Sequence, residues 1–157
     1  MGLYRLLRAK VAYSDGVIDL IPVRESPPSR MLEFGHERVW RITEHGKRLE
    51  IGRIRYRDGE SPGIFFFGHI GYHIDPPWRG HHYAARACRL LREDLLRSGK
   101  SSVVITCDPD NEPSRKTCLA LGCIREGVVD VDPELRKHFD ISPRKERYIW
   151  LLNRSAS

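Results

Sequence analysis

The sequence has 157 residues, of which 40% are hydrophobic, and its 27 basic and 21 acidic side chains give a net charge of +6. This composition is too apolar for a disordered chain, and the length is that of one domain with a full core, so we expect a single domain over residues 1–157. The positive charge favours a negatively charged ligand without identifying it.

Two further classes of protein are disfavoured. No apolar run approaches the roughly 20 residues of a membrane-spanning helix, and the first residues lead into no signal-peptide core, so the expectation is a cytoplasmic protein without membrane contact. The cysteines Cys88, Cys107, Cys118 and Cys123 lack paired C-x-x-C spacing. A zinc ribbon or a disulfide framework is therefore not expected, and reduced, mostly buried thiols are.

The first half of the chain reads as strands. Short strands are predicted within residues 4–13 and 16–23, and a clearer antiparallel hairpin is predicted from Glu37–Thr43 and Leu49–Tyr56, which flank a glycine turn. A third, aromatic-rich strand is predicted over Ile64–Ile74, where two prolines follow.

A helix and a second strand follow. Apolar residues at helical spacing predict a helix from Ala84 to Arg97, which Ser98-Gly99 ends. The β-branched run Val103–Cys107 is typical of a strand buried on both faces. Together with Ile64–Ile74, these segments predict a strand, a helix and a parallel strand.

The last third alternates again. A turn over Asp108–Ser114 predicts the start of a short helix that ends near Gly122, and strands are predicted over Ile124–Val131 and Arg147–Leu152. Between these strands, Asp132–Phe139 is predicted to form a small helical insertion.

The loop before the first long helix has the chemistry of an anion site. It reads R-G-H-H-Y-A over residues 79–84. At a helix start, unpaired backbone N–H groups and the positive end of the helix dipole attract phosphate. The loop therefore predicts a phosphate-binding strand, turn and helix.

With this loop, and with D-x-x-N-x-x-S over Asp108–Ser114 after the next strand, the chain resembles the GNAT superfamily of N-acetyltransferases from about Gly68 to Val129. The resemblance implies an α/β fold with a mixed, mostly antiparallel central sheet, splayed parallel strands and flanking helices. It also implies that acetyl coenzyme A (acetyl-CoA) is the acyl donor.

The family's loop pattern [Q/R]-x-x-G-x-[G/A] grips the pyrophosphate of acetyl-CoA with backbone N–H groups. His82 stands at the family's central glycine position, where a backbone of positive φ is normally needed. The residues that align with the pattern are Arg79, Gly80, His81, His82, Tyr83 and Ala84.

The resemblance extends to the acetyl-carrying end of the coenzyme. It implies that Asn111, Ser114 and Arg115, at the start of the second helix, lie near the pantetheine arm. It also places the thioester between the two parallel strands, with a strand N–H near Ile74 holding the carbonyl group.

The proton carriers are less defined by sequence. Many relatives have a tyrosine seven residues after the asparagine as the acid for coenzyme A, and this position is Cys118 here. Cys118 could donate the proton, as could water or another side chain, and packing is the alternative role for this cysteine. His73 is the first candidate for the general base, with a histidine merely hydrogen-bonded on the sheet as the alternative.

The predicted function is an N-acetyltransferase that moves the acetyl group of acetyl-CoA to a primary amine of a small molecule, peptide or protein. Two alternatives stay open: a non-catalytic acyl-CoA-binding regulatory module of the same fold, and a small basic nucleic-acid-binding domain. Glu93 and Asp94 interrupt the basic helix, so no nucleic-acid partner is expected. No metal is expected, because the histidines fall on a strand and a turn with no carboxylate or cysteine at ligand spacing. An open sheet edge allows a homodimer.

Overall fold

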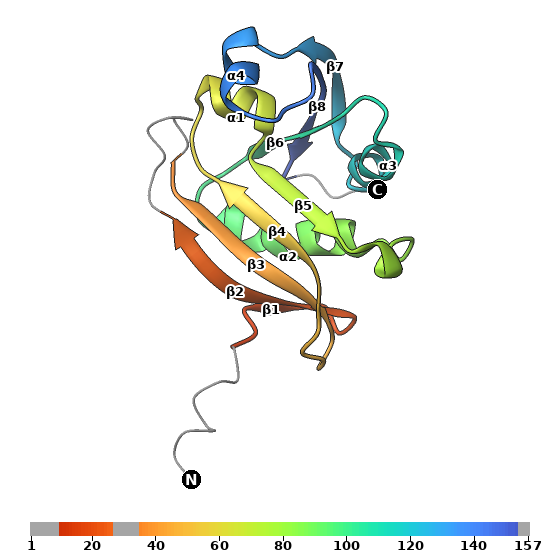
Figure 1. Cartoon of the computed structure of the whole chain (residues 1–157). Coiled ribbons are helices and arrows are strands. Elements are labelled where there is room, and N and C mark those ends of the chain that lie inside the picture. The colour runs from red at the N-terminus through yellow and green to blue at the C-terminus, as the bar shows by residue number, and fades with distance from the viewer. Residues whose placement is uncertain (1–9, 27–34, 154–157) are drawn as a thin grey trace.

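The computed structural model describes residues 10–26 and 35–153. The described strands form one sheet in the order β1-β2-β3-β4-β5-β6-β8-β7, and only β5 and β6 run parallel (Figure 1). The strands are β1 (Tyr13–Ser14), β2 (Ile18–Ser26), β3 (Glu37–Glu44), β4 (Glu50–Arg57), β5 (Ile70–Ile74), β6 (Ser102–Cys107), β7 (Ile124–Asp130) and β8 (Arg144–Leu151). The α-helices are α1 (Pro62–Phe67), α2 (Tyr83–Arg97), α3 (Glu112–Ala120) and α4 (Pro133–His138).

This architecture confirms the predicted α/β class with a mixed, mostly antiparallel sheet. The hairpin is β3 and β4, and the predicted strand, helix and parallel strand are β5, α2 and β6. The helical insertion is α4, capped by Asp132, whose side chain accepts a hydrogen bond from the Glu134 N–H. Of the first predicted strand, residues 4–9 lie outside the described residues, and only Tyr13 falls in β1.

One element was predicted wrongly. The segment Ile64–Ile74 is not one long strand, because Pro62–Phe67 forms α1 and the strand begins only at Ile70. The Ser61 side chain accepts a hydrogen bond from the Ile64 N–H, and Gly68, at φ 76°, ends the helix. The aromatic run suits a strand by propensity, but the serine cap and the proline in the first turn favour a helix.

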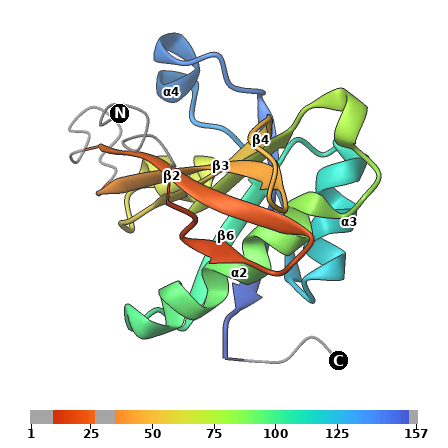
Figure 2. The same cartoon turned by 90° about the horizontal axis from the view of Figure 1, so that it is seen from below.

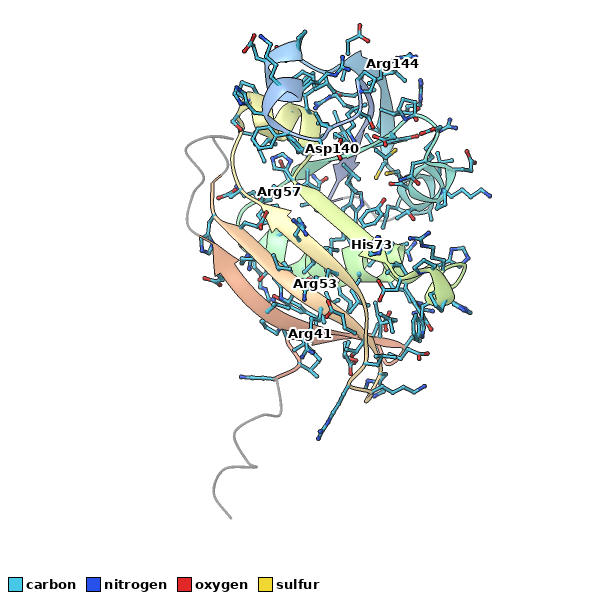
Figure 3. The ribbon with its side chains drawn as sticks, in the orientation of Figure 1. Arg41, Arg53, Arg57, His73, Asp140 and Arg144 are labelled. Carbon is cyan, nitrogen blue, oxygen red and sulfur yellow. The ribbon has the colours of Figure 1, made fainter. Side chains whose placement is uncertain are left out.

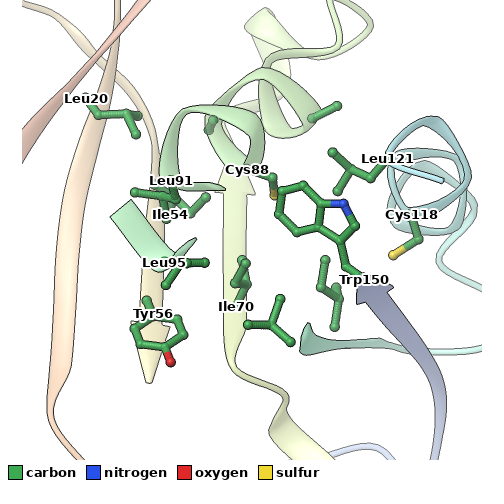
Figure 4. Packing of buried hydrophobic residues seen from close by; sticks show 14 of the residues in the cluster. Leu20, Ile54, Tyr56, Ile70, Cys88, Leu91, Leu95, Cys118, Leu121 and Trp150 are labelled. Atoms are coloured by element: carbon green, nitrogen blue, oxygen red, sulfur yellow. The ribbon is translucent and has the colours of Figure 1, made fainter. Parts of the chain in front are cut away.

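The core lies between the sheet and α2. Buried residues of α2, including Cys88, Leu91 and Leu95, belong to one cluster with Ile54 and Ile70 of the sheet (Figure 4). These helix positions recur at helical spacing, which is why the sequence predicted this face. Figure 2 shows α2 on one side of the sheet and α4 on the other. No described helix is long and apolar enough to cross a membrane.

The two parallel strands share a single pair of facing residues, Ile70 and Ile105. Just before that pair, the His69 N–H donates to the Val104 carbonyl at 2.8 Å, and His69 Nδ1 accepts from the Val104 N–H at 2.9 Å. Nδ1 therefore carries no proton, and Nε2 donates to the Gly59 carbonyl at 2.9 Å. This buried histidine fixes the point beyond which β5 and β6 separate.

Candidate functional site

The glycine loop turns into α2 through a left-handed residue. His82 has φ 60° and ψ 25°, and among the described residues it is the only non-glycine residue with positive φ. The histidine therefore adopts the backbone conformation for which the family's glycine is suited. Gly80, with φ 86°, supplies a second left-handed turn two residues earlier.

The first turn of α2 offers backbone donors. His82, its N-cap residue, makes no side-chain cap hydrogen bond, and the helix is 15 residues long. An uncapped helix start leaves backbone N–H groups directed outward and a partial positive charge, which suits a phosphate group. The predicted loop residues thus meet at one helix end.

Side chains of the loop hold it against the sheet. Arg79 Nε donates to the Ile74 carbonyl at 2.8 Å, and the Tyr83 hydroxyl lies 3.3 Å from Glu44 Oε2, to which it donates. The His81 and Tyr83 rings stack with centroids 5.3 Å apart. The loop is therefore tied both to the end of β5 and to the end of β3.

Backbone N–H groups of β5 face β6, the strand that separates from it. Two bonds show which residue pairs exchange hydrogen bonds between β4 and β5. The Arg57 N–H donates to the His69 carbonyl at 2.7 Å, and the Asp75 N–H donates to the Ile51 carbonyl at 2.8 Å. In an antiparallel pair such residues alternate, so the N–H groups of Tyr72 and Ile74 point away from β4, towards β6. The Ile74 N–H, which the resemblance names as the carbonyl donor, therefore points towards β6.

The start of α3 lies beside β5. Asn111 caps the helix, with Oδ1 accepting from the Ser114 N–H at 3.3 Å, and Ser114 is buried. Arg115 Nε lies 3.0 Å from Glu146 Oε2 and Nη1 lies 3.2 Å from Glu112 Oε2. Asn111 and Arg115 thus have structural partners of their own, whereas Ser114 reaches across to β5.

Tyr72 is a residue of this site that the sequence prediction missed. Its hydroxyl lies 2.8 Å from Ser114 Oγ. Burial, and then the neighbouring Cys118 and Cys88, raise the pKa of Tyr72 well above its ordinary value. The hydroxyl is therefore protonated at neutral pH, at the place where Cys118 was expected to act.

Cys118 itself has the environment of a packing residue. Its side chain is fully buried in the core cluster. The hydrogen bond with Cys123, together with burial, raises the pKa of the Cys118 thiol far above its ordinary value. All four cysteines are free, and all except Cys123 are buried, as predicted.

His73 lies on the opposite face of β5 from Tyr72. Its side chain is 63% exposed, and its Nε2 lies 3.3 Å from Asp75 Oδ1. Its cross-strand neighbour is Arg53 of β4. The two candidate proton carriers, His73 and Tyr72, therefore flank one strand from its two sides. Within the described residues, no three potential metal ligands come together.

The sheet is mostly antiparallel, and its two parallel strands separate next to a helix start that suits a phosphate group. This combination defines an acyl-CoA N-acyltransferase fold. A family model described as the acetyltransferase (GNAT) domain matches residues 23–124, more than half of the sequence, so the chain belongs to the GNAT acetyltransferase family. No curated protein matches the chain.

Solved structures show the same fold. The microcin C7 self-immunity acetyltransferase MccE, solved with acetyl-CoA and AMP, is 22% identical with a TM-score of 0.56, over 73% of this chain and 61% of its own. The ribosomal-protein-S5-alanine acetyltransferase of Vibrio fischeri is 20% identical with a TM-score of 0.57, over 74% of this chain and 62% of its own. This chain thus covers less than two thirds of either protein. A structure described as a candidate acetyltransferase is 19% identical with a TM-score of 0.62, over 89% of this chain and 86% of its own.

Proposed function

We propose that this protein is an N-acetyltransferase that transfers the acetyl group of acetyl-CoA to a primary amine. The observation that carries the proposal is the position of two sets of backbone donors, the N–H groups at the start of α2 and the N–H of Ile74. The uncapped start of α2, entered through the left-handed His82, lies at the end of β5, where the Ile74 N–H faces the separated β6. A phosphate group and an acyl carbonyl are the groups that these two sets would bind.

We assign the residues to parts of the coenzyme as follows. N–H groups from Gly80 to Ala84 would hold the pyrophosphate, and the pantetheine arm would pass between β5 and α3, beside Ser114. Asn111 would act by capping α3 and so fixing Ser114 in place. Arg115 would act through Glu146, which it holds next to α3.

Acetyl-CoA would supply a thioester, whose carbonyl carbon the acceptor amine attacks. The Ile74 N–H would donate to the carbonyl oxygen as negative charge develops there. As the new C–N bond forms and the C–S bond breaks, the Tyr72 hydroxyl would give its proton to the departing sulfur. His73 would accept a proton from the attacking amine on the other face of β5. Tyr72 would then recover its proton from solvent, and His73 would release its proton to solvent.

The carbonyl donor gives a sharp test. An Ile74→Pro variant removes one N–H that makes no bond to β4, whereas Ile74→Ala trims the side chain and keeps the N–H. The proline variant should lose about 10²- to 10³-fold in turnover, as is typical for one lost carbonyl donor, while the alanine variant should retain most of the activity. Release of the coenzyme A thiol with a panel of amines and peptides measures both.

Coenzyme binding separates this proposal from its alternatives. Calorimetric titrations with acetyl-CoA, coenzyme A and duplex DNA at two salt concentrations should show tight binding of both coenzymes. Binding of coenzyme without acetylation of any amine or peptide would favour a regulatory module, which the buried Cys118 at the usual acid position would also suit. Strongly salt-dependent DNA binding alone would favour the nucleic-acid-binding domain.

A further inference from the structure

One face of the sheet carries an unexpected concentration of arginines. Arg41 of β3 lies directly opposite Arg53 of β4, and Arg53 lies opposite His73 of β5. Arg55 and Arg57 follow on β4 at alternate positions, so their side chains share that face. We call Arg41, Arg53, Arg55 and Arg57 the arginine face; Figure 3 labels Arg41, Arg53 and Arg57 of this set.

The main core cluster lies on the opposite face of these strands, among the residues that pack with α2. α2 packs on the other face of these strands (Figures 1 and 2). Arg41 and Arg53 lie directly opposite each other, and like charges in such a position of an antiparallel pair destabilise a sheet. The Arg53 side chain is 44% exposed.

Carboxylates balance only part of this charge. Glu37 Oε2 lies 3.2 Å from Arg57 Nε, and Glu50 pairs with Arg53. In the part of the chain that the structure describes, neither Arg41 nor Arg55 forms an ion pair. Two guanidinium groups of the arginine face are therefore available to an external anion.

The arginine face reaches the strand that carries the proposed acetyl site. A Cβ atom at Gly71 of β5 would lie 3.4 Å from Cγ of Arg55 and 3.6 Å from Nη1 of Arg57, so both side chains extend over that glycine. His73, the candidate base, is the next residue of β5 on this face. A molecule bound to the arginine face thus lies beside the residue proposed to receive the amine proton.

We propose that the arginine face binds an acidic polypeptide segment that carries the acceptor amine. With strands about 4.8 Å apart and alternate residues about 6.8 Å apart, Arg41 and Arg55 are separated by roughly 8 Å, more than one carboxylate spans. Alternate acidic side chains of an extended polypeptide lie on one side of it, about 6.8 Å apart, which is close to this spacing. Nucleic acids also carry repeated negative charge, but they lack an aliphatic amine that could be acetylated.

The test measures peptide binding apart from catalysis, because the proposal rests on the acetyltransferase function above. Fluorescent peptides of equal length, with Asp and Glu or with Asn and Gln after a free N-terminus, are titrated in the presence of coenzyme A and followed by anisotropy. The acidic peptide should bind at least about tenfold more tightly at low salt, and this preference should shrink as salt rises.

An Arg41→Gln/Arg55→Gln double variant should lose the preference for the acidic peptide. A Lys10→Gln/Arg97→Gln variant, with the same loss of two charges at exposed positions elsewhere, should keep it. Equal binding of both peptides, or equal losses in the two variants, would overturn the proposal. So would an RNA oligonucleotide that binds more tightly than the acidic peptide with the same dependence on Arg41 and Arg55. Acidic-peptide binding without acetylation would support the arginine face as a peptide-binding site, but it would contradict both the enzymatic proposal and the assignment of the peptide as the acceptor.

Discussion

At the scale of single residues, the most unusual backbone in the described chain belongs to His82. A left-handed conformation costs a non-glycine residue about 1–2 kcal/mol, and histidine occupies it more readily than branched residues do. The cost is acceptable only if the loop conformation itself is useful, as it is when N–H groups must converge on a ligand.

His82→Gly should therefore preserve coenzyme binding and change the free energy of unfolding by less than about 1 kcal/mol, because relief of strain and the greater freedom of the unfolded chain offset each other. His82→Val should lower stability by about 2 kcal/mol and weaken coenzyme binding at least tenfold. Thermal unfolding and calorimetric titration measure the two effects. His81→Val is the matched control, since His81 has no positive φ. If His81→Val caused the same loss, the role assigned to the backbone of His82 would be wrong.

The second prediction at the scale of single residues concerns the Tyr72 hydroxyl. Tyr72→Phe removes one oxygen and keeps the ring, so turnover should fall by roughly 10²-fold or more while coenzyme affinity changes little. Cys118→Ser, at the position where relatives carry their acid, should leave turnover nearly unchanged. Thiol release under saturating substrates, with the coenzyme Kd measured separately, distinguishes the two. A large loss in Cys118→Ser with an active Tyr72→Phe would return the role to the cysteine.

These two residues show how far the sequence leads at a site. Alternation along a strand places Tyr72 and His73 on opposite faces, and the loop motif located the turn into α2. The contact between Tyr72 and Ser114 joins residues 42 positions apart, and it depends on where α3 packs against β5. No local pattern encodes that packing, so the sequence pointed to Cys118 by alignment and missed the tyrosine.

At the scale of elements, one charged group ties α2 to β3. Asp94 of α2 accepts a hydrogen bond from the Tyr13 hydroxyl at 2.7 Å and lies 2.6 Å from Arg38 Nη2. Burial works to raise the pKa of Asp94, but the bonds from Arg38 and Tyr13 outweigh it and hold the pKa below its ordinary value of 3.8. The guanidinium of Arg38 also lies 5.2 Å from the centroid of the Trp40 ring.

The pKa of Asp94 is lower in the folded chain than in the unfolded chain. The carboxylate therefore contributes fully to stability when the pH is above its ordinary pKa, and this contribution is lost as the pH falls through the pKa of the folded state. Asp94→Asn should therefore lower the free energy of unfolding by about 1–3 kcal/mol at pH 7. The difference from the unmodified protein should shrink steadily below the ordinary value of 3.8. Urea unfolding at a series of pH values measures it, with the exposed Glu93→Gln as control. A difference that does not depend on pH would mean that the charge of Asp94 is unimportant.

The elements themselves were predicted unevenly, for a physical reason. Strands and helices with a strong periodic pattern, such as β4 and α2, were found within one residue of their observed bounds. α1 was missed because its Phe65, Phe66 and Phe67 have the propensity of a strand. The helix is stabilised by distant contacts: Arg147 of β8 donates to the Phe65 carbonyl, and its guanidinium lies 3.7 Å from the centroid of that ring.

At the scale of the whole molecule, the sheet has two halves. β1 to β5 form one half and β6 to β8 the other, and between them the parallel strands share one facing pair. α2 packs against the first half and connects in sequence to the second, and His69 bonds across the junction. A ligand that touches the start of α2, the Ile74 N–H and α3 would therefore bridge both halves.

Coenzyme A should accordingly stabilise the two halves together. At a free concentration of about 100 times its Kd, the stabilisation is about 2.7 kcal/mol, which for a chain of this size raises the melting temperature by roughly 5–10 °C. Hydrogen exchange should slow at the first turn of α2, at Ile74 and at the first turn of α3, because the ligand contacts the first two and fixes the third through Ser114. The β2–β3 strand pair, which is not among the proposed coenzyme contacts, is the internal control. Protection of α2 with unchanged exchange in α3 would mean that the coenzyme binds the loop without entering between β5 and β6, and the catalytic roles given to Ile74 and Tyr72 would then be wrong.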